Sequence, residues 1–375
     1  MSLSARKLLL PLHLWTGLTI GLLLMVMAAT GSLMLFRKQL EHRLDPRKFV
    51  VEPGPARLAP DELVALARAA HPAGQVDNVR YSGEPTAPFM VYFTNKDFVH
   101  LNPYTGAVLG VRARYGSLFG WLEGMHKFLQ LEPAVGEPIT GYTAMVFGFI
   151  ILSGLVLWWP ATRRALKAGL TLNRKLKGRP WNLNLHKVLG AYAALILLFS
   201  VSTGVPISLD WAKDALYPLT GSQKSPPPVA PAAASGDFAG FDAAALSIAT
   251  VYPGAAEIYI SLPKNGLVAA YVIESGATHP NARSYVWLEP ATAMVIQAKP
   301  YAQAAAGFWL YYWMMSLHTG VVGGLVWQFI LLFGALSVLV LGYTGTASYL
   351  RRKFGRPLAS AAAAKVPVDV SLKSA

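Results

Sequence analysis

Two stretches of this chain repeat one pattern: HLWTGLTIGLLLMVMAATG at residues 13–31 and HKVLGAYAALILLFSVSTG at residues 186–204. Both read H-x3-G-x12-T-G, and both lie in long apolar runs. A histidine inside a membrane span is costly unless it has a partner or a function. Because His13 and His186 occupy equivalent points of a repeated unit, we expect them to ligate one shared cofactor. Haem held between helices is the leading interpretation.

The composition is that of a membrane protein, with 54% hydrophobic and 14% charged residues in a chain of 375. Four runs are long enough to cross a hydrocarbon layer of roughly 30 Å as helices. The first follows Arg6 and Lys7 as a signal peptide would, but its apolar core is too long, so we interpret it as an uncleaved anchor. The four runs are Leu8 to Phe36, Ile139 to Trp159, His186 to Leu209 and Val326 to Tyr349.

The positions of the basic residues predict the orientation in the membrane. The net charge of +14 is concentrated in the N-terminus, the loop 160–187 and the tail, whereas segments 37–138 and 210–308 are nearly balanced. By the positive-inside rule, the basic parts face the cytoplasm and both large segments face the opposite side. The high net charge therefore needs no nucleic-acid partner. The loop contains eight basic residues and no acidic one: Arg163, Arg164, Lys167, Arg174, Lys175, Lys177, Arg179 and Lys187.

The two large segments follow the same order of expected elements. Helices are expected over 61–70 and 241–249, with Asp61 and Asp242 near their starts. Strands over 90–93 and 267–272 precede two further strands, which end in similar turns at 102–106 and 289–293. Each segment is therefore expected to form a small α+β domain. Residues 222–236, rich in Ser, Pro and Ala, are expected to be a linker.

A second pair of histidines follows the two domains. His126 lies in an amphipathic stretch over 115–131 and His318 in another over 308–319, each followed by a helix breaker, at 133–138 and at 320–324, and then by a span. Both stretches are typical of interfacial helices. Because both halves begin in the cytoplasm, the repeats are parallel and related by an axis along the membrane normal. His13 pairs with His186 near the inner face, and His126 pairs with His318 near the outer face.

Several residue types limit the chemistry. The chain contains no cysteine, which excludes covalent haem attachment through C-x-x-C-H and a cysteine-ligated iron–sulfur cluster. It also has no G-x-G-x-x-G or P-loop motif.

Met125, Met314 and Met315 could supply axial sulfur, although apolar filling is the simpler interpretation. The dipeptides Thr30-Gly31 and Thr203-Gly204, together with Gly345, are interpreted as sites of close helix packing. The remaining histidines, which have no repeat partner, are expected at the surface: His42, His71, His100 and His279.

These motifs together resemble the PepSY-associated transmembrane family over roughly residues 8–355. The resemblance rests on L-H-x-W-x-G-L near residue 12, the paired N/E-P-x-T turns, L-H-T-G before the last span, and G-L-V-L-W-W-P closing the second span. Within that family the chain is most similar to the ferric-siderophore (ferrioxamine) reductases of the bacterial inner membrane. The resemblance implies b-type haem and electron delivery to ferric siderophore in the periplasm.

The predicted fold is a polytopic α-helical membrane protein with four transmembrane helices in two parallel pseudo-twofold repeats and two periplasmic α+β PepSY-like domains. His13, His186, His126 and His318 are the predicted axial ligands of two non-covalent haem b groups, and no other catalytic residue is expected. The predicted divisions are 1–36 (first transmembrane helix), 37–114 (first PepSY-like domain), 115–160 (interfacial and second transmembrane helices), 161–185 (basic cytoplasmic loop), 186–209 (third transmembrane helix), 210–304 (second PepSY-like domain), 305–350 (interfacial and fourth transmembrane helices) and 351–375 (cytoplasmic tail).

The predicted function is electron transfer across the inner membrane to ferric siderophore, with quinol or a cytoplasmic reductase as donor and membrane lipid as the surroundings. Two alternatives stay open from the residues alone. One is a transporter or scaffold that binds siderophore or peptide without redox activity. The other is a haem-dependent reductase of a partner protein or a quinone. Four spans make a small permease, and the repeated histidines would have no role in one.

Overall fold

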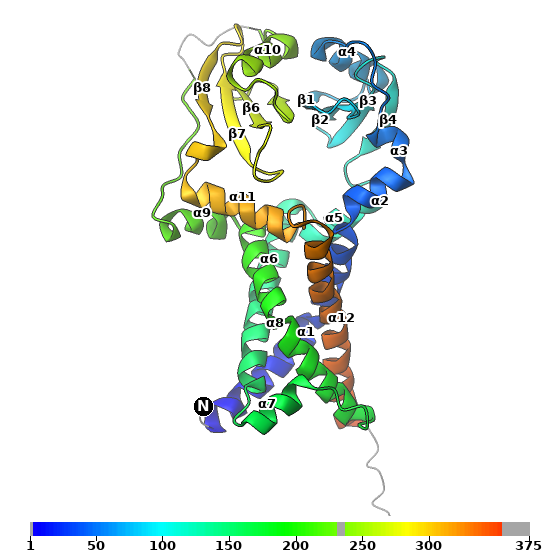
Figure 1. Cartoon of the computed structure of the whole chain (residues 1–375), viewed down its shortest axis with the longest axis vertical. Coiled ribbons are helices and arrows are strands. Elements are labelled where there is room, and N and C mark those ends of the chain that lie inside the picture. The colour runs from blue at the N-terminus through cyan, green and yellow to red at the C-terminus, as the bar shows by residue number, and fades with distance from the viewer. Residues whose placement is uncertain (1–2, 231–236, 355–375) are drawn as a thin grey trace, which may run out of the picture.

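The computed structural model describes residues 3–230 and 237–354. A stem of long helices carries two lobes built on one β-sheet, as Figure 1 shows. The stem helices are α1 (Leu3–Met34), α6 (Pro133–Trp158), α8 (Gly178–Ser208) and α12 (Gly324–Phe354). The shorter helices are α2 (Arg37–Leu44), α3 (Pro46–Phe49), α4 (Pro60–Ala70), α5 (Leu118–Phe128), α7 (Arg163–Leu170), α9 (Asp210–Leu219), α10 (Phe241–Val251) and α11 (Ala306–His318), with the 3-10 turn η1 (Tyr301–Gln303).

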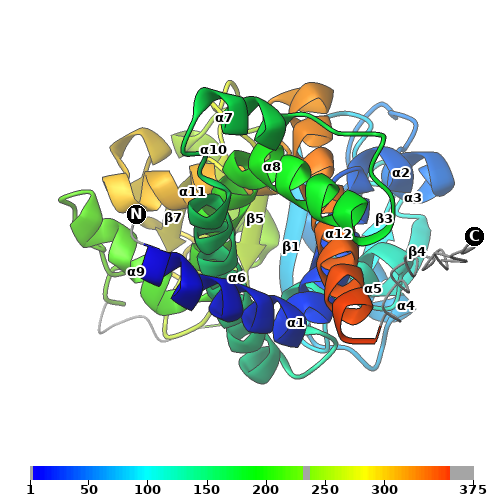
Figure 2. The ribbon, with the colours of Figure 1, turned by 90° about the horizontal axis from the view of Figure 1, so that it is seen from below.

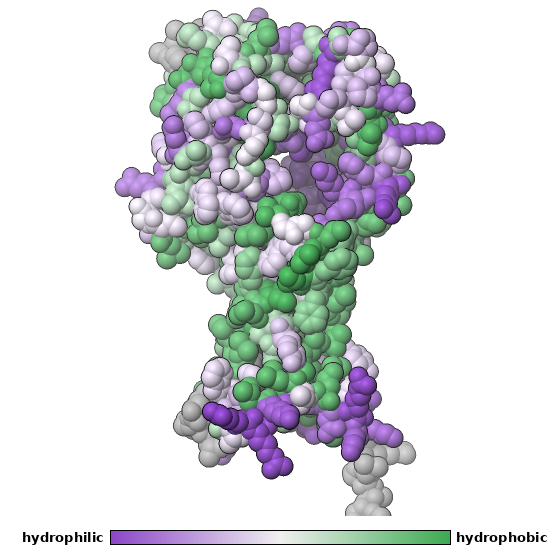
Figure 3. Space-filling model, in the orientation of Figure 1, coloured by the Kyte–Doolittle hydropathy of each residue, from purple (hydrophilic) through white to green (hydrophobic). Residues whose placement is uncertain are grey.

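The four stem helices are long and apolar enough to cross a membrane. At a rise of about 1.5 Å per residue, even 26 residues span about 39 Å, more than the roughly 30 Å hydrocarbon layer. Viewed from below, they surround a common centre, where Leu24, Ile151 and Leu197 pack together (Figure 2). The outer surface of the stem is a hydrophobic band that ends in hydrophilic residues at its lower end (Figure 3). Such a surface is suited to lipid and supports a membrane-embedded protein.

Two of the predicted helix starts were wrong. The third stem helix begins at Gly178, eight residues before the predicted start at His186, because polar and basic residues hide a helical segment from a hydropathy argument. Residues 178–185 therefore belong to α8 and not to the loop predicted over 161–185. The second begins at Pro133, inside the predicted breaker 133–138. Proline fits the first helical turn, where its missing N–H has no intrahelical partner to lose.

The extramembrane sheet has eight antiparallel strands in the order β4-β3-β2-β1-β5-β6-β7-β8. Strand β1 pairs with β5, so one continuous sheet joins the two lobes, with Val79 opposite Ile260. The predicted strands are present as β2, β3, β6 and β7, and those at the outer edges and the centre were not anticipated. The strands are β1 (Val76–Ser82), β2 (Phe89–Phe93), β3 (Asp97–Leu101), β4 (Val108–Ala113), β5 (Glu257–Ser261), β6 (Val268–Ile273), β7 (Arg283–Leu288) and β8 (Val295–Lys299).

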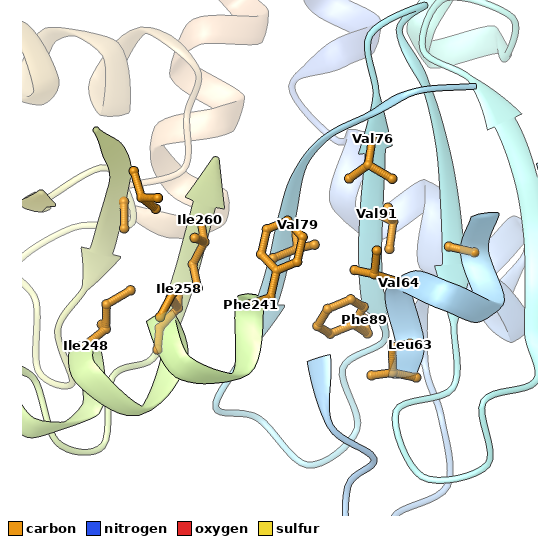
Figure 4. Packing of buried hydrophobic residues seen from close by; sticks show 14 of the residues in the cluster. Leu63, Val64, Val76, Val79, Phe89, Val91, Phe241, Ile248, Ile258 and Ile260 are labelled. Carbon is orange, nitrogen blue, oxygen red and sulfur yellow. The ribbon is translucent and has the colours of Figure 1, made fainter. Parts of the chain in front are cut away.

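One face of this sheet packs against α4 and α10 and forms the main hydrophobic core of the lobes. Figure 4 shows Phe241 of α10 beside Val79 and Ile260, at the junction of the two lobes. The expected helices over 61–70 and 241–249 correspond to α4 and α10. Because successive side chains of a strand point to opposite faces of the sheet, every second side chain lies on the face away from α4 and α10.

Asp61 and Asp242 cap each other's helices across the junction. The Asp61 carboxylate accepts hydrogen bonds from the backbone N–H groups of Phe241 and Asp242, at 2.9 and 3.0 Å. The Asp242 carboxylate accepts one from the N–H of Asp61 at 2.9 Å. Each carboxylate therefore accepts hydrogen bonds from backbone N–H groups at the N-terminus of the other helix, where these groups have no partner within the helix and the helix dipole is positive. This exchange fixes the two lobes against each other.

Short helices connect the sheet to the stem. The amphipathic stretches predicted over 115–131 and 308–319 contain α5 and α11, which lie between the sheet and the stem in Figure 1. The glycines of the predicted breaker, Gly320, Gly323 and Gly324, all have positive φ and form the turn between α11 and α12. Residues 222–230 of the predicted linker are irregular, and 231–236 lie outside the described residues, as do 355–375 of the predicted tail.

Candidate functional site

The structure brings His13 and His186 together in the lower part of the stem. Their ring centres lie 6.3 Å apart, and the ring planes are nearly perpendicular at 89°. His13 reaches from α1 to α6, where its Nδ1 lies 3.0 Å from the hydroxyl of Ser153. His186 reaches from α8 to α12, where its Nδ1 lies 3.1 Å from the hydroxyl of Thr344. The two side chains thus bridge all four stem helices.

His126 and His318 occupy the upper end of the same stem. His126 of α5 contacts α1, with its Nδ1 2.8 Å from the carbonyl oxygen of Met27 and 3.5 Å from the hydroxyl of Thr30. His318 of α11 contacts α8, with its Nδ1 3.0 Å from the hydroxyl of Thr203. Burial, together with the nearby His126, lowers the pKa of His318 to about 4. Burial also lowers the pKa of His126. Both imidazoles are therefore neutral near pH 7, the form that binds metals.

The hydrogen bonds decide which ring nitrogen is free. A carbonyl oxygen only accepts hydrogen bonds, so Nδ1 of His126 must carry the proton that it donates to Met27. The hydroxyls of Thr203 and Thr344 donate to the backbone carbonyls of their own helices and present a lone pair to the histidines. Each Nδ1 is thus the donor, which leaves each Nε2 with a free lone pair. This is the tautomer of a metal-ligating histidine whose second nitrogen is held by another protein group.

A glycine follows each of the four hydroxyl residues and lies against the histidine ring. A Cβ atom on Gly31 would approach Cε1 of His126 to 2.9 Å, and one on Gly204 would approach Cε1 of His318 to 2.9 Å. The inner pair has the same arrangement, at 3.1 Å for Gly154 with His13 and 3.4 Å for Gly345 with His186. The Thr-Gly dipeptides and Gly345 were interpreted as sites of helix packing, but here they receive histidine side chains.

Ser153 and Thr344 were not anticipated as part of the site. The sequence contains a signal for them, because each stem helix has a hydroxyl residue followed by glycine: Thr30-Gly31, Ser153-Gly154, Thr203-Gly204 and Thr344-Gly345. Only the packing of α1 on α6 assigns His13 to Ser153, and only that of α8 on α12 assigns His186 to Thr344.

The chemistry of these donors fits haem. Among residues 3–230 and 237–354, no three His, Asp or Glu side chains gather as they would around a bare metal ion. Haem iron needs only two axial ligands from protein, because the porphyrin supplies the others. Two imidazoles on opposite sides of one metal, each bonded through nitrogen at about 2 Å, have ring centres roughly 6 Å apart. The 6.3 Å spacing of His13 and His186 matches that arrangement.

The sequence matches the family described as PepSY-associated TM region over residues 10–352. The chain belongs to this family. The match includes the four stem helices, the sheet and both histidine pairs, and it agrees with the family resemblance of the sequence motifs. No curated protein matches the chain significantly.

Two further histidines of this PepSY-associated protein are buried, although they were expected at the surface. His100 is 1% exposed in β3, enclosed by Phe49 and Phe98. His279 is 3% exposed and hydrogen-bonds the hydroxyls of Tyr301 and Ser316. Neither lies in a repeated position, so sequence spacing contained no signal for their burial.

The sheet face opposite α4 and α10 carries aromatic and cationic side chains. Tyr259 stacks on Tyr271 with ring centres 4.7 Å apart. The guanidinium of Arg283 lies 4.4 Å from the ring centre of Tyr271 and 5.1 Å from that of Tyr312. Tyr312 belongs to α11, the helix that ends at His318. Figure 3 shows a hydrophilic recess between the lobes of this PepSY-associated protein, above the stem.

Proposed function

We propose that this protein is an inner-membrane di-haem b cytochrome that transfers electrons across the membrane and reduces ferric siderophore in the periplasm. The observation that carries the proposal is the pair of histidines at each end of the stem, with every Nδ1 held by an acceptor. The inner site comprises His13 and His186, and the outer site comprises His126 and His318. Family membership and the apolar stem support the same function.

The residues have separate roles in this proposal. The four imidazoles bind iron through Nε2, and Ser153, Thr344, Thr203 and the Met27 carbonyl hold the Nδ1 protons. When bound, haem supplies one-electron transfer at its iron. The packed apolar helices exclude water from the space between the sites. No acid, base or nucleophile is needed, because electron transfer to ferric iron breaks no covalent bond in the protein or the chelator. Ferrous iron is held less tightly by hard oxygen ligands, so reduction favours its release.

The charge distribution supports the proposed direction. The lower end of the stem is flanked by the basic loop and by Arg351, Arg352 and Lys353, and the positive-inside rule supports a cytoplasmic location for such an end. In this proposed orientation the sheet lies in the periplasm. We propose that the two halves are parallel repeats about an axis along the membrane normal, since His13 corresponds to His186 and His126 to His318 in both sequence order and contacts.

The test is a pyridine-haemochrome assay on purified protein, combined with single histidine substitutions. We expect about two haem b per chain, since each site has two axial ligands. His13→Ala and His186→Ala should remove the same haem, and His126→Ala and His318→Ala should remove the other. One haem per fully loaded chain, or a common haem lost from His13→Ala and His318→Ala, would contradict the two-site arrangement. A colourless protein would favour the transporter or scaffold.

A further inference from the structure

A cavity lies between α8 and α12 at the proposed cytoplasmic end of the stem. Its volume is about 520 Å³, within the range of roughly 300–1,000 Å³ typical of small-molecule sites. The cavity residues, as we call them below, are Gly178, Trp181, Asn182, Leu185, Leu339, Val340, Tyr343, Thr344 and Arg351.

An unpartnered polar group faces this cavity. Asn182 is 6% exposed, and its side-chain Nδ2 has no hydrogen-bond partner. One helical turn beyond Thr344, Ser348 is 5% exposed, and its hydroxyl also lacks a partner. A buried polar group without a partner costs free energy, roughly 1–3 kcal/mol. The amide of Asn182 is therefore available for a ligand with a hydrogen-bonding group.

The corresponding positions of the first half are apolar. Asn182 lies four residues before His186, and Leu9 lies four residues before His13. Ser348 lies four residues after Thr344, and Leu157 lies four residues after Ser153. The first half therefore has leucine at both positions, and neither its stem helices nor its proposed haem ligand needs a polar residue there. Of the two polar residues, Asn182 lines the cavity, and it therefore indicates a ligand that only the second half binds.

The cavity lies beside the inner histidine pair but outside the space between His13 and His186. Thr344 lines the cavity and also holds Nδ1 of His186 at 3.1 Å. All the cavity residues belong to α8 or α12, whereas a cofactor held by both histidines must also contact α1. The cavity occupant and the inner haem are therefore neighbours rather than the same molecule.

We propose that this cavity binds a membrane quinol, the electron donor of the function proposed above. Tyr343 is 62% exposed on the apolar surface of the stem, so the cavity is open toward lipid. Trp181 and Tyr343 offer aromatic surfaces for a planar ring, and Asn182 and Arg351 offer hydrogen-bond donors to its oxygens. A soluble nucleotide would instead need a phosphate-binding motif, which the sequence does not contain.

The electron count is balanced with the ferric chelate as acceptor. Oxidation of one quinol to the quinone breaks two O–H bonds and releases two electrons and two protons. The electrons reduce two ferric ions to ferrous ions in succession, and the protons leave to water at the cytoplasmic mouth beside Arg351. One quinol is thus consumed for every two iron ions released.

The first test measures reduction of the haem-loaded protein in lipid nanodiscs by decylubiquinol. Asn182→Leu should raise the quinol concentration for half-maximal rate at least ten-fold, with haem content and the dithionite-reduced spectrum unchanged. Leu9→Ala, at the matched position of the other half, should leave the quinol dependence as in the wild type. Unchanged quinol kinetics in Asn182→Leu would overturn the proposal, and so would loss of haem from Asn182→Leu alone, because the amide would then serve the haem.

The second test does not depend on haem. A photoreactive azido-quinone should label peptides of α8 and α12 in the wild type and lose that labelling in Asn182→Leu. Labelling at other helices, or a tightly bound phospholipid in place of the quinone, would overturn the proposal. Labelling of these helices in a protein that contains no haem would support the quinone site but contradict the proposed cytochrome function.

Discussion

At the scale of single residues, the hydrogen-bond acceptor that holds Nδ1 of each histidine says as much about the proposed metal-binding role as the histidine itself. Thr203 donates its own hydroxyl proton to the carbonyl of Phe199 at 2.8 Å and can only accept from Nδ1 of His318. An imidazole whose N–H is held by an acceptor becomes a more basic ligand. Such a ligand favours the ferric over the ferrous state, so Thr203 is expected to lower the midpoint potential of the proposed outer haem without touching it.

Thr203→Val therefore gives a residue-level prediction. Valine keeps the shape of threonine but removes the acceptor, so the midpoint potential of the outer haem should rise and its affinity should fall about 10–100-fold. Redox titration of the reduced α-band measures the potential, and haem retention during dilution measures the affinity. Thr203→Ser, which retains the hydroxyl, is the control. Equal potentials in the valine and serine variants would show that the hydrogen bond has no such role.

The histidines could be predicted from the sequence, but their acceptors could not. The repeat spacing singled out His13 and His186 because a histidine is rare in an apolar span. Ser153 and Thr344 are ordinary residues in such spans, and their role depends on which helices pack together. His100 was assigned to the surface for a similar reason, since the burial of one polar residue in a short strand depends on Phe49 from outside the sheet.

At the scale of elements, the reciprocal caps of α4 and α10 give a stability prediction. Asp61→Ala removes the acceptor for two N–H groups of α10 and should destabilise the lobes by about 1–2 kcal/mol, the typical cost of losing a helix cap. Thermal unfolding of the purified protein measures the change. The exposed neighbour Glu62 supplies the control, Glu62→Ala. Similar unfolding temperatures for the two variants would show that the caps contribute little to joining the lobes.

The attachment of α5 should depend on pH. Burial alone would raise the pKa of Glu123, but Arg114 and Arg37 bind its carboxylate at 3.1 and 2.9 Å and lower the pKa below its ordinary 4.5. A lowered pKa in the folded state stabilises the protein fully above the ordinary pKa, and this contribution is lost as the pH falls through the folded value.

The predicted result is a decrease in unfolding temperature below about pH 4.5 that Glu123→Gln reduces. At pH 7 the glutamine variant should be less stable than the wild type, because both arginines lose an ionised partner. Unfolding temperatures at a series of pH values measure both effects. A wild-type and a variant curve that run parallel into acid would show that this carboxylate is not the titrating group.

The apolar central parts of the helices and strands were easier to predict than the residues at which these elements begin and end. The alternation in 90–93 and 267–272 predicted strands β2 and β6, because apolar residues must face the core at every second position. Strand β4 has only exposed and half-buried residues and gives no such pattern. The segment 178–185 became helical through continuation of α8, although its own composition is polar.

At the scale of the whole molecule, the sheet is attached to the stem by ion pairs as well as by the chain. Arg37 of α2 binds Glu41 of the same helix and Glu123 of α5, while Arg112 of β4 binds Glu41 at 2.9 Å. These contacts hold α5, and with it His126, between the sheet and α1. The order of elements along the chain was predictable from the repeated motifs. The joining of both lobes into one sheet was not, because β1 and β5 are distant in the sequence.

The arrangement of both sites along one stem leads to a prediction about direction. In the proposed function, electrons should enter at the end of His13 and His186, beside the basic residues, and leave at the end of His126 and His318, beside the sheet. In vesicles of known orientation, an impermeant ferric siderophore should therefore reoxidise the haems only from the periplasmic side. Absorbance of the reduced α-band under anaerobic conditions measures the rate.

Two substitutions distinguish the entry end of the proposed electron path from its exit end. His126→Ala should abolish reoxidation by the siderophore while the inner haem is still reduced, because the donor end is intact. His13→Ala should prevent reduction by quinol, although dithionite can still reduce the outer haem directly. Both variants retain the sheet and its ion pairs, so a loss of siderophore binding is not expected. Equal reoxidation from both faces of the wild type would contradict directional transfer and favour haem storage or redox sensing, since in the proposed orientation only one end of the path along the stem faces the periplasm.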